Sequence, residues 1–169
     1  MRRRGVSAYL LPTLVLLLAD APPAPPETLL VPSFNAADAN MVKIVRQGAM
    51  RRLRSPECQR VLADFRDPEG RTLLENLQSF GMEPEGYLET IAFLDGRNQA
   101  FCRSGRVYLA TVIGARRVFV CRPFFQAVWQ DRGRVEISVI HEMLHTLKLG
   151  EDPPSSVEIT DQVVARCGR

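Results

Sequence analysis

The chain has 169 residues, a length that predicts a single globular domain. Its 22 basic and 19 acidic residues give a net charge of +3, much of which comes from arginines near the N-terminus. This balance argues against a nucleic-acid-binding protein. The one local basic stretch, formed by Arg46, Arg51, Arg52 and Arg54, is interrupted by apolar residues and is interpreted as the solvated face of a helix. We therefore expect no nucleic-acid partner.

An apolar segment near the N-terminus predicts export. Three arginines at positions 2–4 precede an apolar run from Tyr9 to Ala19, which has the length of a signal-peptide core and is short for a membrane span. Ala19-Asp20-Ala21 resembles a cleavage site, but Pro22 follows it directly. We interpret residues 1–21 as a signal peptide or an N-terminal anchor. Membrane contact is expected only through this segment, if it stays uncleaved.

A proline-rich stretch follows the apolar segment. Four of the five residues from 22 to 26 are proline, a composition typical of stiff and extended linkers. We therefore expect residues 22–35 to form a linker and residues 36–169 to form the folded domain.

The cysteines agree with export to the periplasm or the extracellular space. The chain contains four, at positions 58, 102, 121 and 167, and none of them forms a CxxC pair. An even number of widely spaced cysteines in an exported chain favours two disulfides. Of the three possible pairings we prefer Cys102–Cys121, which would staple the strand region, together with Cys58–Cys167, which would tie the C-terminus to an early helix.

The first half of the domain predicts helices. Residues 36–54 carry apolar side chains at helical spacing. Ser55 and Pro56 are typical first residues of a second helix, which should run to about Arg66. Two shorter helices are expected over residues 72–80 and 84–94.

The pattern then changes to strands. Residues 106–113 and 116–121 are rich in Val, Ile, Tyr and Phe, and Gly114-Ala115 separates them, so a β-hairpin is expected. Residues 123–130 lead into the next helix, with Phe124, Phe125 and Trp129 expected in the core.

The segment from Val135 to Gly150 predicts one buried helix. Its apolar positions are dense, and Gly150 is placed as a C-terminal stop. With the preceding elements, it predicts an α+β fold that is mainly helical. A small β-hairpin or sheet would pack beside this helix.

That helix carries the pentapeptide His141-Glu142-Met143-Leu144-His145, which contains the only two histidines of the chain. Helical positions four apart differ by about 40° around the axis and lie about 6 Å apart, so both imidazoles project from one face. They can hold one metal ion there, and Glu142 is placed to reach a water bound to it. Polar groups in so apolar a helix are costly unless they are satisfied, and a metal would satisfy them.

With these residues the chain resembles the zincin metallopeptidases, which share the HExxH motif. A broader likeness, from Val139 to about Cys167, is to small bacterial proteins classed as zincin-like metallopeptidases. The resemblance implies Zn²⁺ as cofactor, His141 and His145 as ligands, Glu142 as general base and a peptide or protein substrate. It also implies that a strand upstream of the motif, residues 117–121, is the edge that captures extended substrate.

A catalytic zinc usually takes three protein ligands, and no third histidine is available. Glu151 lies six residues after His145, which is the spacing of the third ligand in those zincins where a glycine turns the chain back toward the metal. Lys148 occupies that glycine position here, so the turn is expected at Gly150. We expect Lys148 to extend to solvent or to pair with Glu151 or Asp152.

Glu158 and Asp152 are the alternatives to Glu151 as third ligand. Glu158 lies on a helix expected after Pro153-Pro154, in a position similar to that of the third ligand of gluzincins. Ser155 and Glu158 also have the spacing of a capping box, so Glu158 could serve the helix end alone.

The sequence therefore favours an exported zinc metallopeptidase that uses a metal-activated water and Glu142 as general base. The alternative is an exported, non-catalytic binding domain with a structural or vestigial zinc site. A helical interaction protein without metal is a third possibility, and it predicts no bound zinc.

Overall fold

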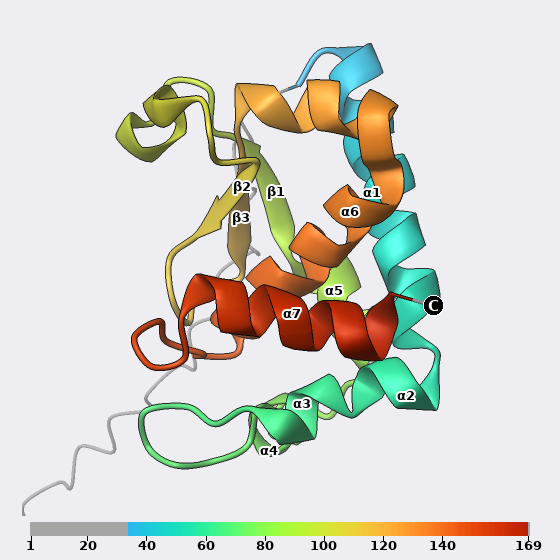
Figure 1. Cartoon of the computed structure of the whole chain (residues 1–169). Coiled ribbons are helices and arrows are strands. Elements are labelled where there is room, and N and C mark those ends of the chain that lie inside the picture. Colours follow the sequence, from blue (N-terminus) through green and yellow to red (C-terminus); the bar gives the residue numbers. More distant parts are fainter. Residues whose placement is uncertain (1–33, 169) are drawn as a thin grey trace, which may run out of the picture.

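The computed structural model describes residues 34–168. The expected signal peptide or anchor (1–21) and all but the last two residues of the expected linker (22–35) lie outside this range. The fold is α+β and mainly helical, as predicted (Figure 1). Its helices are α1 (Ala36–Leu53), α2 (Pro56–Gln59), α3 (Val61–Asp64), α4 (Leu73–Gln78), α5 (Pro84–Thr90), the 3₁₀ helix η1 (Ala100–Ser104), α6 (Arg122–Thr146) and α7 (Ser156–Cys167).

A three-stranded sheet lies beside α6. It contains β1 (Ala92–Asp95), β2 (Leu109–Thr111) and β3 (Arg117–Val120), in the order β1-β3-β2. The antiparallel pairing of β2 with β3 confirms the expected hairpin. The parallel pairing of β1 with β3 was not expected, because residues 84–94 were predicted as one helix. The helix ends at Thr90, and residues 92–95 take their backbone partners from a strand about 25 residues away, which local periodicity does not reveal.

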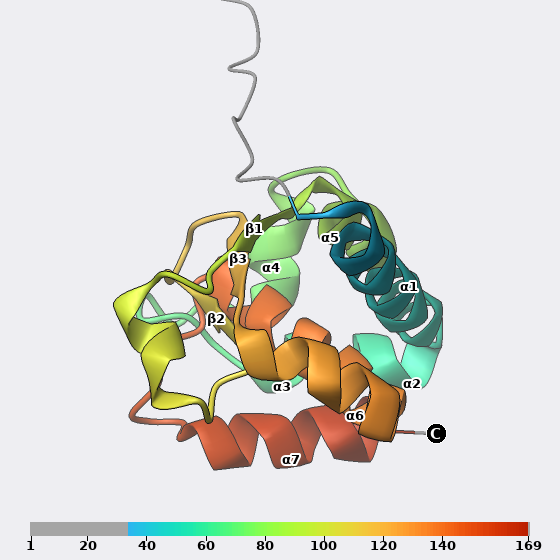
Figure 2. The same cartoon turned by 90° about the horizontal axis from the view of Figure 1, so that it is seen from above.

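Helix α6 runs through the centre of the molecule and contacts α1, α7 and β2 (Figures 1 and 2). It is interrupted at Asp131, whose backbone is not helical. The Asp131 carboxylate accepts a hydrogen bond from the backbone N–H of Arg134 at 3.0 Å, so it caps the segment that carries the two histidines. Trp129, just before the kink, is 79% exposed, so its expected place in the core was wrong.

Helices α1 and α6 approach closely at Gly48, where a Cβ atom would overlap the Glu136 carboxylate. That buried carboxylate pairs with Arg52 at 2.8 Å, and the same guanidinium donates to the carbonyl of Cys167 at 2.7 Å. Arg52 therefore joins α1, α6 and the end of α7. The interpretation of the whole basic stretch as a solvated face was wrong for this residue, because the stretch winds around the helix and turns one arginine inward.

Both expected disulfides are present. Cys58–Cys167 joins α2 to the last residue of α7, and Cys102–Cys121 joins η1 to the residue that precedes α6. Two disulfides indicate an oxidising, exported environment. Among the helices of residues 34–168, none is both long and apolar enough to cross a membrane.

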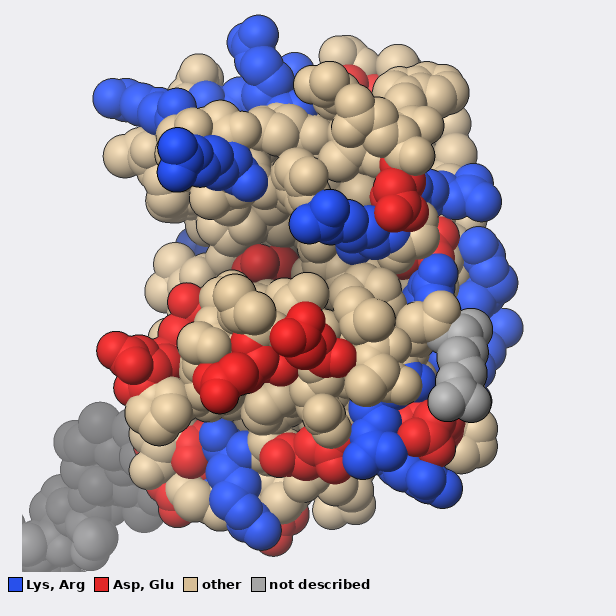
Figure 3. Space-filling view, in the orientation of Figure 1, with Lys and Arg blue, Asp and Glu red and all other residues tan. Residues whose placement is uncertain are grey.

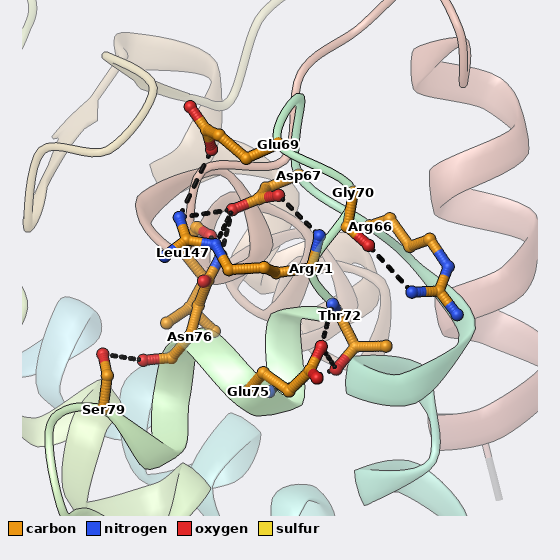
Figure 4. A network of polar contacts seen from close by, with 10 residues as sticks. All are labelled: Arg66, Asp67, Glu69, Gly70, Arg71, Thr72, Glu75, Asn76, Ser79 and Leu147. Atoms are coloured by element: carbon orange, nitrogen blue, oxygen red, sulfur yellow. Dashed lines mark hydrogen bonds and ion pairs between the residues drawn. The ribbon is translucent and has the colours of Figure 1, made fainter.

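The C-terminal end of α6 is held by a buried polar network (Figure 4). The side-chain amide of Asn76 donates to the carboxylate of Asp67 and to the carbonyl of Leu147, each at 2.9 Å. Burial raises the pKa of Asp67, but hydrogen bonds from Asn76 and Arg71 outweigh it and hold that pKa well below its usual range. The network fixes the point where the chain leaves the helix.

Replacing Asn76 with leucine is expected to destabilise the protein by about 2–3 kcal/mol. The change leaves the buried Leu147 carbonyl without its side-chain donor and removes one of the donors to the Asp67 carboxylate, which keeps its hydrogen bonds from Arg71. The shift in the urea denaturation midpoint measures the effect. Ser79→Ala, which removes a hydrogen bond of 2.6 Å at the exposed end of α4, is the matched control. Equal losses in the two variants would contradict this role of Asn76.

Candidate metal centre

Three potential metal ligands converge at the C-terminal end of α6. His141 and His145 lie one turn apart on the helix, and Glu151 comes from the loop that follows it. The two Nε2 atoms are 3.0 Å apart, and Oε1 of Glu151 lies 3.2 Å from Nε2 of His145 and 3.8 Å from Nε2 of His141. A tetrahedral zinc site holds its ligand atoms roughly 3.3–3.5 Å apart, so the three atoms are spaced for one such ion.

The orientation of both imidazoles is set by partners at Nδ1. Nδ1 of His145 lies 2.8 Å from the carbonyl of Leu149, which can only accept, so Nδ1 carries the proton of the neutral ring. Nδ1 of His141 lies 3.0 Å from the hydroxyl of Thr160 on α7, which can accept in the same way. When both Nδ1 atoms donate, the two Nε2 lone pairs and the Glu151 carboxylate face one another without a proton between them, an arrangement that a cation stabilises.

Burial favours the neutral form of His141. Its side chain is buried beside α7, and this burial, with a smaller contribution from His145, lowers its pKa to about 4, although Glu151 acts in the opposite direction. The ring is therefore uncharged at neutral pH, which is the form that binds metals.

The turn that brings Glu151 back to the histidines occurs at Lys148. This residue has a φ of +78°, in the left-handed region, and its backbone N–H donates to the carbonyl of His145. The helix thus ends at Thr146, and the expected stop and turn at Gly150 were wrong. Lys148 adopts the conformation that a glycine would favour at this position. Its side chain is exposed and has no ion pair with Glu151 or Asp152 among the described residues.

The other two candidates for third ligand lie elsewhere. Glu158 is exposed, and its carboxylate accepts from the backbone N–H and the hydroxyl of Ser155, both at 2.8 Å, in the capping box of α7. These hydrogen bonds lower the pKa of Glu158, and the one from the Ser155 backbone contributes most. Asp152 is exposed in the loop and is not grouped with the histidines. Of the three carboxylates, the structure brings only Glu151 to the histidines.

A pair of variants separates these roles. Loss of a residue that only supports a ligand weakens metal binding roughly 10- to 100-fold. If Glu151 is a ligand itself, Glu151→Ala should weaken zinc binding by more than this. Glu158→Ala is expected to keep zinc affinity and to lose some stability through the broken capping box. Competition with a fluorescent zinc chelator and thermal unfolding of the metal-free proteins measure the two effects. The opposite pattern would assign the ligand to Glu158.

Glu142 follows the first histidine and lies in the wall of a cleft. Burial, with a smaller contribution from Glu151, raises the pKa of its carboxyl, while Thr111 and His145 lower it. The buried hydroxyl of Thr111 faces Glu142 at a geometry short of a regular hydrogen bond. A half-buried carboxyl with a raised pKa is suited to exchange a proton with a neighbouring group.

The cleft has a volume of about 800 Å³ and is bordered by residues 106–109, α6 and α7. It contains His141 and Glu142 at one end and the start of the kinked segment of α6 at the other. The space-filling view shows a hollow with basic side chains above and acidic side chains below (Figure 3). The edge strand beside the cleft is β2. The β3 strand is paired on both sides, with β1 and with β2, so it cannot accept a further strand. The expected edge at residues 117–121 was therefore wrong.

Three groups at the site were not predicted from the sequence: Thr160, Thr111 and the Leu149 carbonyl. Thr160 shares a face of α7 with Ser156 and Val164, at helical spacing, and all three line the cleft. That periodicity marks a helix face, but it does not indicate that the face meets His141. Comparisons with protein-family models, with curated proteins and with solved structures find no match to this chain.

Proposed function

We propose that this protein is a zinc-dependent peptidase. The observation that carries the proposal is the convergence of His141, His145 and Glu151 next to the half-buried Glu142 in a cleft of about 800 Å³. Imidazole nitrogens and a carboxylate oxygen form a donor set that suits zinc, and the ring partners at Nδ1 fit ligands of this kind. Zinc held there would supply a water of lowered pKa and would polarise a carbonyl of the substrate.

The proposed chemistry of the chain is proton transfer by Glu142. Its carboxylate would take a proton from the attacking water and return it to the leaving amine of the cleaved peptide bond. Burial of Glu142 keeps its pKa raised, so the protonated form is reached more easily than in a carboxyl exposed to water. Glu151 and the two histidines would hold the metal and take no part in this transfer.

The number of candidate ligands and the exposure of Glu151 to solvent favour a catalytic site over a structural one. Structural zinc sites are closed and have four protein ligands, whereas catalytic sites have three and keep a position open. The described residues offer three ligands, and the carboxylate of Glu151 is half exposed. An exported binding domain with a structural or vestigial zinc is the alternative against which the proposal is tested.

The β2 strand provides a place for the backbone of a peptide substrate. Its Leu109 and the preceding Val107 and Tyr108 line the cleft, and its other side is already paired with β3. An extended peptide would add to this edge as a further strand, with its scissile bond near Glu142. The protein would act after export, with residues 1–21 as the export signal or anchor.

Zinc content and peptide hydrolysis test the proposal together. The purified protein is expected to contain about one zinc per chain by elemental analysis, and His145→Ala to contain none. Removal of zinc with a chelator should stop hydrolysis of a peptide library. The protein should stay folded, which an unchanged circular dichroism spectrum would show. Unfolding on chelation would favour the structural alternative, because a structural zinc contributes directly to folding. A folded parent that takes up no zinc would exclude the peptidase.

A further inference from the structure

The end of the cleft away from the histidines carries two arginines whose side chains have no partner among the described residues. Arg106 comes from the segment before β2, and Arg134 comes from the first turn of the kinked part of α6. Both side chains are exposed, and neither guanidinium forms an ion pair or hydrogen bond within residues 34–168. Two separate elements therefore bring free positive charge to one end of the same cleft.

The other charged groups at this end do not fully cancel the positive charge of these two arginines. Arg52 also borders the cleft, but its charge is matched by Glu136 and its position is fixed by the Cys167 carbonyl. Asp131 is the one acidic side chain among the described residues that line this end; it caps the backbone N–H of Arg134 and offsets one of the arginine charges, which leaves an excess of positive charge. The start of the helix segment adds a partial positive charge of its own.

The acidic groups lie toward the other end and on the outer rim. Glu142 and Glu151 belong to the metal centre, and exposed Asp152, Glu158 and Asp161 follow along the loop and α7. A bound Zn²⁺ would offset the charges of Glu142 and Glu151 at the metal centre. The guanidinium groups at the far end therefore provide the excess charge that a ligand spanning the cleft would meet.

The distance along α6 between Arg134 and His141 indicates which residue of a bound peptide would reach the arginines. Arg134 precedes His141 by seven residues, which is two helical turns, so both lie on the same face about 10 Å apart along the axis. An extended peptide advances about 3.3 Å per residue. A group held by Arg134 therefore lies about three residues from the bond that reaches the metal centre.

We propose that the cleft selects peptides with a carboxylate about three residues from the scissile bond, bound by Arg106 and Arg134. This specificity rests on the proposed peptidase function, because that function defines the peptide and the bond. The shared chemistry is the carboxylate, which an Asp or Glu side chain or a free C-terminus can supply. A guanidinium group binds a carboxylate through two parallel hydrogen bonds, and two such groups can share one.

Binding to the zinc-loaded full chain with Glu142→Gln tests the proposal without turnover. The probes are short fluorescent peptides in which one glutamate is moved through every position, each compared with glutamine at the same position. A second set compares a free with an amidated C-terminus. We expect about tenfold tighter binding of glutamate at one position about three residues from the anchored bond. The double variant Arg106→Gln/Arg134→Gln should reduce this preference to within about twofold.

Arg54→Gln is the matched control, because Arg54 is exposed, forms no ion pair in the described part of the chain and does not border the cleft. It should leave the preference unchanged, whereas high salt should weaken it. A glutamate preference that survives the double variant, or no preference at any position, would overturn the proposal. Hydrolysis by the parent protein is scored separately, so loss of the peptidase function and loss of this specificity are distinguishable.

Discussion

Replacing Glu142 with glutamine is expected to lower kcat/KM for peptide hydrolysis by about 10²- to 10⁴-fold, the usual contribution of a general acid–base group. Glutamine has nearly the same shape and fills the same place in the cleft wall, but it cannot take up and return a proton. Steady-state hydrolysis of a fluorogenic peptide library measures the loss.

Zinc content separates this effect from damage to the site. Glu142 is not among the converging ligand atoms, so the neutral amide should leave zinc binding intact. Ser138→Ala, which changes another polar side chain lining the cleft, should retain hydrolysis and serves as the control. Hydrolysis by Glu142→Gln at the parent rate would exclude Glu142 as the general base.

Removing the Cys58–Cys167 disulfide is expected to cost about 4–5 kcal/mol of stability. This bond joins residues 109 apart in the sequence, and in the chain-entropy model a closed loop of about 100 residues corresponds to roughly 4.7 kcal/mol. Both cysteines are buried, so alanine at each position removes the link with a small change in volume. Urea denaturation of the double alanine variant measures the loss.

The Cys102–Cys121 pair provides a matched comparison within the same chain. Its residues are only 19 apart, so its loss is expected to cost about 3 kcal/mol. The longer link also holds α7, whose Thr160 contacts His141, and so its removal should weaken zinc binding more than removal of the shorter link. If the Cys102–Cys121 variant proved the less stable of the two, loop closure would not be the main contribution of these bonds.

Local patterns predicted most of the helical elements correctly. The helix from Ala36, the start at Pro56, the capping box at Ser155 and the β2–β3 hairpin all depend on residues close in sequence, and each is present. The i, i+4 spacing of His141 and His145 likewise needs only helical geometry to place both rings on one face. Both disulfides followed from the number of cysteines and the expected export, with pairings chosen by the elements that they would join.

Several errors share one cause, which is that their outcome depends on residues far away in the chain. The strand β1 forms because β3 offers it a backbone partner, and β3 lies in the middle of the sheet for the same reason. Lys148 takes a left-handed conformation because the end of α6 is held by Asn76 and by the backbone of Gly114.

The sequence by itself determined the pair of histidines, the neighbouring glutamate and the set of carboxylates from which a third ligand could come. Only the tertiary structure showed which of those carboxylates lies next to the histidines, because the turn at Lys148 brings Glu151 to the rings while the capping box engages Glu158. It also placed Thr160 behind His141, and it brought into the same cleft two arginines that are unpaired within residues 34–168. Ligand spacing on one helix is a local property, whereas the orientation of the rings and the walls of the cleft arise from packing between distant segments.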